Sequence, residues 1–390
     1  MNRAVRILVE CPTLLASVRL GVLEPMKPLE LQGKCHIKFK ETKDIVKSDI
    51  AWCDVFICVR GCEGTTLQIV KAVKEAGRYI IYYLDDDLLN VPEYALSYSY
   101  YSDKRIQKNL IRILGFSHIL WVSNRLIGEK YGKFCNNNWV QNHVPVVMDD
   151  EFKIKDDNSI RILYAGSIDH TPVVRQYISP IVRKLCSEFG EKISFTFIGV
   201  NPDINDLDNV EIINFFESYE KYKTFVFEGE FHIGLAPIML SEFHKCKYYN
   251  KFIEYTSINA VGVYTNSEPY ALVVKDNING FLCNNTIDEW YSAVKKAIVD
   301  VSLRNFCLIN ARKLIKEEFK PSQIAERLQR DIPEIINFYA PEVSCKEIKL
   351  TNMKISFYQN RFKGIWKRYG LLAIPIAMFK AIKITFRKIY

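Results

Sequence analysis

The chain has 390 residues, 48% of them hydrophobic and 25% charged, with a formal net charge of +8. This length exceeds one ordinary core, and the composition is that of a globular protein, so two domains are expected and a fibrous or disordered chain is excluded. Ten Lys or Arg and no acidic residue lie between residues 349 and 390, so residues 1–348 carry a formal charge of −2. The basic charge therefore belongs to the tail, which argues for an anionic partner there and against a nucleic-acid-binding body.

The 11 cysteines form no C-x-x-C pair and no Cys/His cluster with zinc spacing, so we expect free thiols in a reducing compartment. The N-terminal "MNRAVRILVECP" contains only a short apolar run, which is typical of a first strand rather than a signal peptide. No stretch of about 18 apolar residues occurs, so no membrane-spanning helix is expected.

The first half alternates strand and helix patterns. Short apolar runs predict buried parallel strands at 5–10, 54–59, 78–84 and 117–123. Helical patterns between them cover 65–76, 104–114 and 125–134. The polar stretch "PVVMDDEFKIKDDNS" at 145–159 then indicates a linker, so residues 1–150 are predicted to form an N-terminal Rossmann-like domain.

The same alternation restarts after the linker. Strands are predicted at 159–167, 192–200, 210–215, 231–237 and 260–266. Helices are predicted at 173–189, 248–258, 288–299, 302–318 and 321–338. We therefore predict an α/β protein with two doubly wound domains, the second spanning residues 151–338, and a basic amphipathic tail at 339–390. Ligands of such sheets bind beyond the carboxyl ends of the strands, so the cleft between the domains is the expected site.

The stretch "KCKYYNKFIEYTS" at 245–257 carries charge on one helical face. Lys247, Lys251 and Glu254 are spaced i, i+4, i+7 and share an arc of roughly 60°. A carboxylate can accept both hydroxyls of a ribose, and ammonium groups can neutralise a diphosphate. The alternative interpretation is a solvated face with a Lys251–Glu254 ion pair.

The span 246–282, "CKYYNKFIEYTSINAVGVYTN…NGFL", resembles the nucleotide-sugar site of GT-B glycosyltransferases close to family 4. The resemblance implies that Glu254-Tyr255 belongs to the donor site, with Glu254 on the ribose and Lys247 or Lys251 on the diphosphate. The N-terminal half is similar to a bacterial branch of that fold, through "ASVRLGVLEP" with Arg19, "ICVRG" with Arg60, and "LDDDLLNVP".

One family pattern is replaced in this chain. The Gly-Arg…Lys sequence that follows the first strand of the second domain is absent, and "AGSIDHT" stands there instead. A Gly turn lets backbone N–H groups approach phosphate, so Gly166, Ser167 and His170 are candidate donor-binding residues and Lys247 is the candidate substitute cation. An ordinary strand-to-helix turn with an exposed loop histidine is the alternative.

Three adjacent aspartates, Asp85, Asp86 and Asp87, end a predicted strand. With Arg60 they are expected to line the acceptor side of the cleft, where Asp85 or Asp86 would act as general base or bind acceptor hydroxyls. Because adjacent carboxylates resist full ionisation, a raised pKa is expected in one of them. Two alternatives stay open: the aspartates cap the following helix, or Asp85 and Asp87 hold a metal as in GT-A transferases.

The tail combines basic and aromatic residues. In "FYQNRFKGIWKRY" at 357–369 the aromatic side chains share about 100° of arc and the cations lie outside it. The apolar run that follows is too short to cross a bilayer and contains Pro375. We expect residues 354–390 to bind the anionic inner face of the plasma membrane, with packing against the N-terminal domain as the alternative.

The resemblance, together with these patterns, implies a glycosyltransferase that moves a hexosyl or deoxyhexosyl group from a nucleotide-diphosphate sugar to a saccharide acceptor. The expected acceptor is lipid-linked, in cell-surface polysaccharide synthesis, at the cytoplasmic side of the membrane. The resemblance implies that no metal cofactor is required, and the charge distribution argues that no nucleic acid binds. The alternatives are a metal-dependent GT-A-like transferase that uses Asp85 and Asp87, and a non-catalytic GT-B-shaped binding protein.

Overall fold

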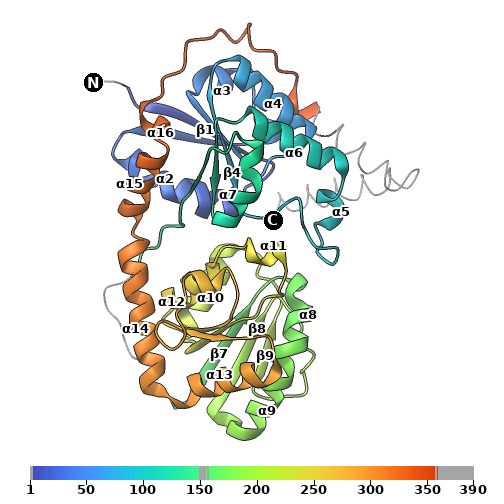
Figure 1. Cartoon of the computed structure of the whole chain (residues 1–390), viewed down its shortest axis with the longest axis vertical. Helices are drawn as coiled ribbons and strands as arrows, with labels where there is room; N and C mark the ends of the chain where they lie inside the picture. Colours follow the sequence, from blue (N-terminus) through green and yellow to red (C-terminus); the bar gives the residue numbers. More distant parts are fainter. Residues whose placement is uncertain (1–2, 149–154, 156–157, 356–357, 359–390) are drawn as a thin grey trace, which may run out of the picture.

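Two six-stranded parallel sheets, each covered by helices, form two lobes stacked along the long axis of the molecule (Figure 1). The computed structural model describes the chain except residues 1–2, 149–154, 156–157, 356–357 and 359–390. The first sheet contains β1 (Val5–Cys11), β2 (Cys35–Glu41), β3 (Val55–Val59), β4 (Tyr79–Leu84), β5 (Ile119–Val122) and β6 (Trp139–Gln141). The second contains β7 (Ile160–Ala165), β8 (Ile193–Ile198), β9 (Val210–Ile213), β10 (Ile233–Ala236), β11 (Val261–Thr265) and β12 (Phe281–Cys283).

The strand order of each sheet reverses once. The first sheet runs β2-β1-β3-β4-β5-β6 and the second β12-β11-β10-β7-β8-β9, and every paired neighbour is parallel. The reversal points are therefore β1/β3 and β7/β10, where the connections leave towards opposite sides and open a crevice at the carboxyl ends of the strands. The prediction of two doubly wound α/β domains is confirmed.

Helices of the first lobe come from both ends of the chain. The first 150 residues form α1 (Ala16–Val18), η1 (Arg19–Leu23), α2 (Glu24–Leu31), η2 (Thr42–Asp44), α3 (Lys47–Trp52), α4 (Gly64–Glu75), α5 (Tyr98–Tyr101), α6 (Lys104–Phe116), α7 (Arg125–Tyr131) and η3 (Gly132–Phe134). The chain returns with α15 (Pro321–Asp331) and α16 (Glu334–Asn337), which Figure 1 shows beside α2 and β1. Leu328, Ile332 and Ile335 are buried in the same core cluster as β1 and β3.

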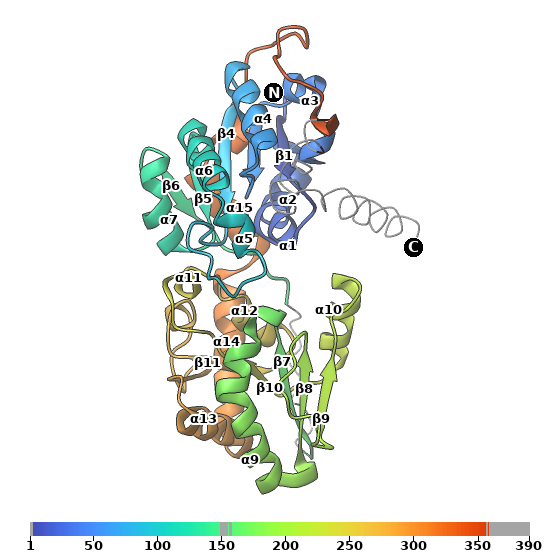
Figure 2. The ribbon, with the colours of Figure 1, turned by 90° about the vertical axis from the view of Figure 1, so that its right-hand side faces the viewer.

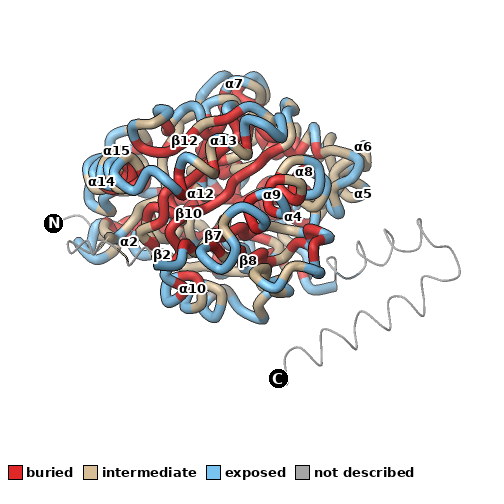
Figure 3. The backbone as a smooth tube through the Cα atoms, turned by 90° about the horizontal axis from the view of Figure 1, so that it is seen from below, coloured by how far each residue is buried: buried red, intermediate tan, exposed pale blue. Residues whose placement is uncertain are grey.

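The second lobe is covered by the remaining helices. They are η4 (Ile168–His170), α8 (Thr171–Val173), η5 (Val174–Ile178), α9 (Ser179–Phe189), η6 (Gly190–Lys192), α10 (Tyr219–Glu228), α11 (Glu242–Lys245), α12 (Asn250–Ser257), η7 (Tyr270–Leu272), α13 (Ile287–Val299) and α14 (Val301–Glu318). Figure 3 shows the buried backbone running through the centre of the molecule, with the exposed turns of the helices around it. The continuous apolar runs of the strands are buried on both faces, as parallel sheets require.

One missed strand and one shortened helix have local explanations. The strand β2 was missed because "CHIKFKE" is an edge strand in which only Cys35 is buried, so its sequence lacks a continuous apolar run. The helix predicted over 321–338 ends at Asp331, because Pro333 cannot continue the hydrogen-bonded ladder, and the short α16 follows it.

The segment after α16, residues 338–355, crosses the first lobe as a strap that is mostly irregular, with a turn at 345–347 and a helical stretch at 353–355. Arg78 Nη1 donates to Pro341 O at 2.6 Å, Thr351 Oγ1 donates to Gln68 of α4 at 3.4 Å, and Ile348 and Met353 are buried in the core cluster of that lobe. Most of the predicted membrane-binding tail, 354–390, lies outside the described residues. Across the described part of the chain, no helix combines the length and the apolar character needed to cross a bilayer. Ten of the described cysteines are buried free thiols, and Cys345 is exposed.

Candidate active site

The carboxyl ends of both sheets face the junction between the lobes (Figure 2). A pocket of about 620 Å³ lies there, beside the β7/β10 reversal point. Its wall includes Arg19 from the first lobe, Gly166 after β7, Tyr222 of α10, and Lys251 and Glu254 of α12. Both lobes therefore contribute to the pocket, as predicted for a site between two doubly wound domains.

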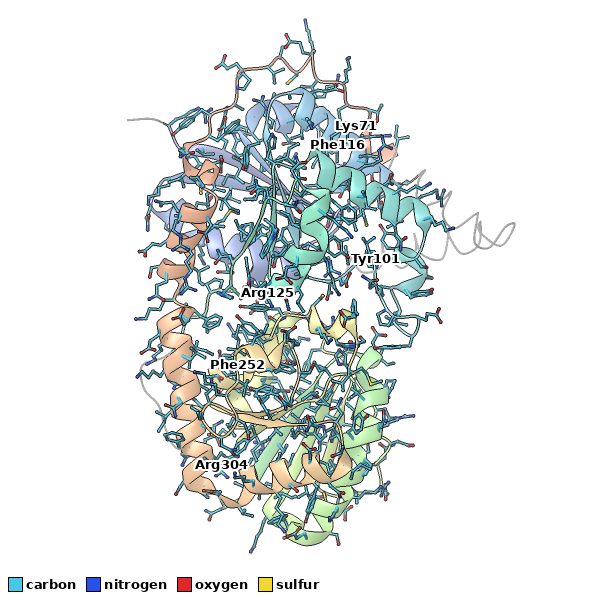
Figure 4. All side chains as sticks on the ribbon, viewed as in Figure 1. Lys71, Tyr101, Phe116, Arg125, Phe252 and Arg304 are labelled. Carbon is cyan, nitrogen blue, oxygen red and sulfur yellow. The ribbon has the colours of Figure 1, made fainter. Side chains whose placement is uncertain are left out.

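The charged end of the pocket is built by α12 and α10. Glu254 accepts a hydrogen bond from the hydroxyl of Tyr222 and pairs with the ammonium of Lys251. Lys251 Nζ lies 3.4 Å from Tyr222 Oη. The opposite face of α12 is buried through Phe252, which Figure 4 labels in the second lobe, and Thr256, so the predicted division of this helix into a buried and a charged face is confirmed.

Gly166 occupies the tight turn that opens the pocket. Its N–H donates to Ile198 O at 3.0 Å, and a Cβ at this position would lie 2.4 Å from Tyr164 Oη. The turn therefore has no room for a side chain unless the Tyr164 ring moves. Ser167 and His170 follow in the same loop but are not part of the pocket wall within the described residues.

Tyr255, predicted as a donor-binding residue, is a core residue instead. It is fully buried, and its hydroxyl donates to Leu235 O at 2.7 Å. Its ring packs over Gly234 of β10, so that a Cβ on the glycine would lie 2.3 Å from the ring. The side chain fixes α12 to the sheet rather than contacting the pocket.

Lys247 does not share a helix with Lys251 and Glu254, contrary to the prediction, because α12 begins only at Asn250. The amide of Asn124, in the first lobe, donates to Lys247 O at 2.8 Å and to Lys245 O at 3.0 Å. The backbone carbonyl of Lys247 therefore accepts a hydrogen bond from the first lobe and does not take part in the hydrogen bonding of a helix. The side chain of Lys247 reaches Asp86, with Nζ 3.0 Å from Oδ1.

Asp85, Asp86 and Arg60 form one cluster at the ends of β3 and β4. Arg60 Nη1 lies 3.1 Å from Asp85 Oδ1, and Nη2 lies 3.4 Å from Asp86 Oδ2. Arg60 adopts φ 55°, a strained conformation for a residue other than glycine, and such strain concentrates at functional sites. Its Nε is buried and, among the described residues, has no hydrogen-bond partner.

The pKa of Asp86 is lowered, whereas a raised pKa was expected in one of the three aspartates. Burial alone would raise the pKa of this carboxyl, but the attraction of Lys247 and Arg60 outweighs burial and lowers it. Asp86 is therefore held ionised between two cations. Asp86 is therefore not the aspartate of the run in which a raised pKa was expected.

Asp87 points away from the other two carboxylates. It is fully buried, accepts from Tyr131 Oη at 2.7 Å and pairs with Lys130 at 3.1 Å. Asp85 and Asp87 thus engage different cations, and no cluster of three metal-ligating side chains occurs in the described parts of the chain. The helix-capping alternative is also wrong, because turns follow the aspartates until α5 begins at Tyr98.

Two histidines flank Lys247, and the sequence pattern identified only one of them. Burial, then the charge of Lys247, lowers the pKa of both His170 and His244 to about 4, so both rings are neutral at neutral pH. Their centroids lie 6.3 Å apart, and His244 is bracketed by Ser241 Oγ at 2.8 Å and Tyr94 Oη at 3.3 Å. No sequence motif includes His244, so sequence analysis did not identify it. Tyr222 was also missed, because the sequence of α10 was not predicted to be a helix.

Arg19 lies at the junction, in the pocket wall and not in the group that forms around the aspartates. Its Nη1 is 2.6 Å from Glu220 Oε1 of α10, so the ion pair spans the two lobes at the rim of the pocket. Of the predicted site residues, the pocket brings together Gly166, Lys251 and Glu254. A second group, Arg60, Asp85, Asp86 and Lys247, forms around the aspartates.

Comparison with known proteins supports the architecture. No protein-family model and no curated protein matches the sequence. Among solved structures, a glycosyltransferase from Rickettsia africae is 12% identical, with a TM-score of 0.60 over 86% of this chain and 100% of that chain. Anabaena HepE in complex with UDP and glucose is 11% identical, with a TM-score of 0.58 over 85% of this chain and 100% of that chain. The trehalose-6-phosphate synthase OtsA is 9% identical, with a TM-score of 0.56 over 86% and 100%.

Identities this low establish the fold alone. Two parallel sheets, each with one reversal of strand order, face each other across a shared pocket, and the solved glycosyltransferase structures align along their whole length. The chain therefore has the GT-B fold, with two Rossmann-like lobes around a cleft.

Proposed function

We propose that the chain is a glycosyltransferase that uses a nucleotide-diphosphate sugar, with a hexose or deoxyhexose as the transferred group. The observation that carries the proposal is the Lys251–Glu254–Tyr222 group at the β7/β10 reversal point, inside a pocket to which both lobes contribute. Structures of the same fold have been solved with UDP, UDP and glucose, and UDP-glucose. A pocket of about 620 Å³ has the volume typical of small-molecule and cofactor sites.

In the proposed complex, Glu254 accepts the ribose hydroxyls of the donor, and N–H groups that follow Gly166 in the turn approach the diphosphate. Lys251 and Lys247 neutralise the diphosphate as it leaves with the electron pair of the broken glycosidic bond. These two ammonium groups supply the cationic charge, so the proposal requires no metal ion.

The acceptor is proposed to bind at Arg60, Asp85 and Asp86. Asp86 is held ionised, which makes it a weak base and suits it to orienting an acceptor hydroxyl. Arg60 pairs with both carboxylates and fixes their positions. We further propose a saccharide acceptor carried on a lipid, in bacterial cell-surface polysaccharide synthesis at the cytoplasmic face of the plasma membrane. The basic, aromatic composition of residues 354–390 and the sequence resemblance support this setting.

Calorimetric titration with UDP, GDP, ADP and dTDP, with and without EDTA, tests the donor site. We expect one nucleotide to bind regardless of EDTA and Glu254→Ala to weaken that binding at least tenfold, because two charge-assisted hydrogen bonds are lost. Glu228→Ala is the matched control, since Glu228 is exposed on α10 and outside the pocket wall. Binding that disappears with EDTA would instead support a metal-dependent site, and no binding of any nucleotide would support a non-catalytic protein.

A further inference from the structure

A lysine of the linker between the lobes contacts the second lobe through its ammonium group. Lys155 lies in the polar stretch that the sequence predicts as a linker. Its Nζ donates to three backbone carbonyl oxygens, Ile258 O at 2.9 Å, Asn259 O at 3.0 Å and Phe231 O. An ammonium group has three N–H donors, so the three oxygens use all of them. The proposed function assigns no role to this residue.

Two of the three oxygens belong to the C-terminal end of α12. Asn259 adopts φ 58°, and its N–H and that of Ala260 donate back to carbonyls of the helix, at 3.1 Å and 2.8 Å. This Schellman motif satisfies two carbonyls of the last turn but not those of Ile258 and Asn259. The C-terminus of a helix carries partial negative charge, so the ammonium of Lys155 stabilises this end by charge as well as by hydrogen bonds.

The third oxygen joins the end of α12 to the second sheet. Phe231 is fully buried and lies two residues before β10, and Ala260 directly precedes β11, so the contact is at the amino ends of the strands. Arg312 of α14, which runs beside α12 in Figure 1, donates to Asn259 Oδ1. Lys155 therefore connects the linker, the end of α12 and the start of β10 at one point, away from the pocket at the carboxyl ends.

The charged form of Lys155 is the form that fits the three oxygens. Burial lowers the pKa of Lys155 to about 8, with smaller opposing effects of Glu230, which raises it, and Arg161, which lowers it. The side chain is therefore still mostly protonated at neutral pH. A neutral amine has only two N–H donors, so it would leave one carbonyl oxygen without a hydrogen bond.

We propose that the three carbonyl oxygens form a site for a small cation with N–H donors, that the ammonium of Lys155 occupies it, and that this occupation positions α12. A small alkylammonium ion should replace the side chain, because it supplies the same charge and the same donors. Packing of the lysine methylene groups alone would predict no such replacement. The helix carries Lys251 and Glu254 in the pocket wall, so the effect of the site on nucleotide binding rests on the proposed function.

Thermal unfolding in the presence of amines tests the cation site. Lys155→Ala removes the ammonium and leaves room for a small ion, whereas Lys155→Met removes the ammonium and fills the space. We expect both variants to unfold roughly 5–10 °C below the wild type, because backbone oxygens lose their donor. Methylammonium chloride should restore most of this loss in Lys155→Ala and none in Lys155→Met. Tetramethylammonium chloride has the charge but no N–H donor, so it should restore neither variant.

Hydrogen exchange measured by mass spectrometry tests the positioning of α12 without any nucleotide. Amides of residues 250–258 should exchange roughly tenfold faster in Lys155→Ala than in the wild type, and methylammonium should reverse the change. The cognate nucleotide should bind Lys155→Ala roughly threefold to tenfold more weakly, again with recovery in methylammonium. If the wild type binds no nucleotide, the proposed function fails, while unfolding and exchange still decide the cation site and its effect on α12.

Two variants of the second lobe serve as controls. Lys192→Ala removes an exposed cation and should unfold like the wild type. Leu185→Ala destabilises α9 in a core cluster that contains no described residue of α12, so methylammonium should not restore it. Wild-type unfolding of both Lys155 variants would overturn the proposal. So would equal recovery of Lys155→Ala in tetramethylammonium, or recovered unfolding with exchange in α12 left fast.

Discussion

The ion pair between Lys247 and Asp86 places one ammonium group between two proposed substrates. Lys247 is proposed to meet the donor diphosphate, yet in this structure its Nζ lies 3.0 Å from Asp86 of the acceptor side. The two residues stand 161 positions apart, so no local pattern could pair them. A diphosphate that engages Lys247 must compete with Asp86, and Asp86 is then left with Arg60 alone.

Replacing Asp86 should therefore strengthen nucleotide binding. In Asp86→Asn the carboxylate no longer competes for Lys247, and we expect UDP, if it is the cognate nucleotide, to bind roughly threefold to tenfold more tightly. Calorimetry measures the change, and the cognate nucleotide replaces UDP if another one binds. Lys247→Ala should weaken binding and should abolish the gain in the double variant.

An exposed aspartate provides the matched control for this prediction. Asp208→Asn changes the same formal charge in the second lobe and should leave the affinity unchanged. Weaker nucleotide binding in Asp86→Asn than in Asp208→Asn would contradict the competition.

The helix α12 depends on β10 for its position. The helix carries Lys251 and Glu254 on its pocket side, and Tyr255 on the other side rests directly on Gly234. The charged face of α12, formed by Lys251 and Glu254 three residues apart, was readable from the sequence. The glycine in the opposing strand was not, because the contact exists only after the strand and the helix pack together.

A methyl group at Gly234 should displace α12. The added Cβ would lie 2.3 Å from the buried ring of Tyr255, and overpacking of this kind costs about 1–3 kcal/mol of unfolding free energy. Gly234→Ala should lower the thermal unfolding midpoint by several degrees and weaken nucleotide binding. Gly115→Ala in α6, where the nearest atom is 3.8 Å from the new Cβ, should be neutral or stabilising. An unchanged thermal unfolding midpoint in Gly234→Ala would show that the Tyr255 ring can move aside without loss of unfolding free energy.

At the scale of the whole molecule, one segment of the second lobe is built into the first. Cys246 is fully buried within the core cluster of the first lobe, and its Sγ lies 3.8 Å from Asp87. Lys130 lies 3.1 Å from Asp87 and 3.5 Å from Glu242, so it links the two lobes. Asn124 caps α7 through its carbonyl oxygen and holds Lys245 O and Lys247 O through its amide.

Asn124→Asp separates these two roles of Asn124. The carboxylate can still accept from Leu126 N and cap α7, but it loses both amide donors and faces two carbonyl oxygens. We expect a larger radius of gyration in small-angle scattering and faster proteolysis between the lobes, with little loss of helix content. Asn136→Asp, at an exposed turn of the first lobe, is the charge-matched control. A compact Asn124→Asp protein would mean that the remaining junction contacts suffice.

The sequence by itself determined the class of fold and the helix that carries the charged pocket residues. Apolar runs of strand length and the buried face of α12 are local consequences of burial, which a single segment reveals. Only the tertiary structure decided what the three aspartates and Lys247 do. Asp86 joins Lys247 across the junction, Asp87 turns into an ion pair with Lys130, and Tyr255 becomes core. The partner of each of these side chains is distant in sequence and becomes a neighbour only when the strands and lobes pack together. The spacing of residues along the chain therefore could not predict these contacts.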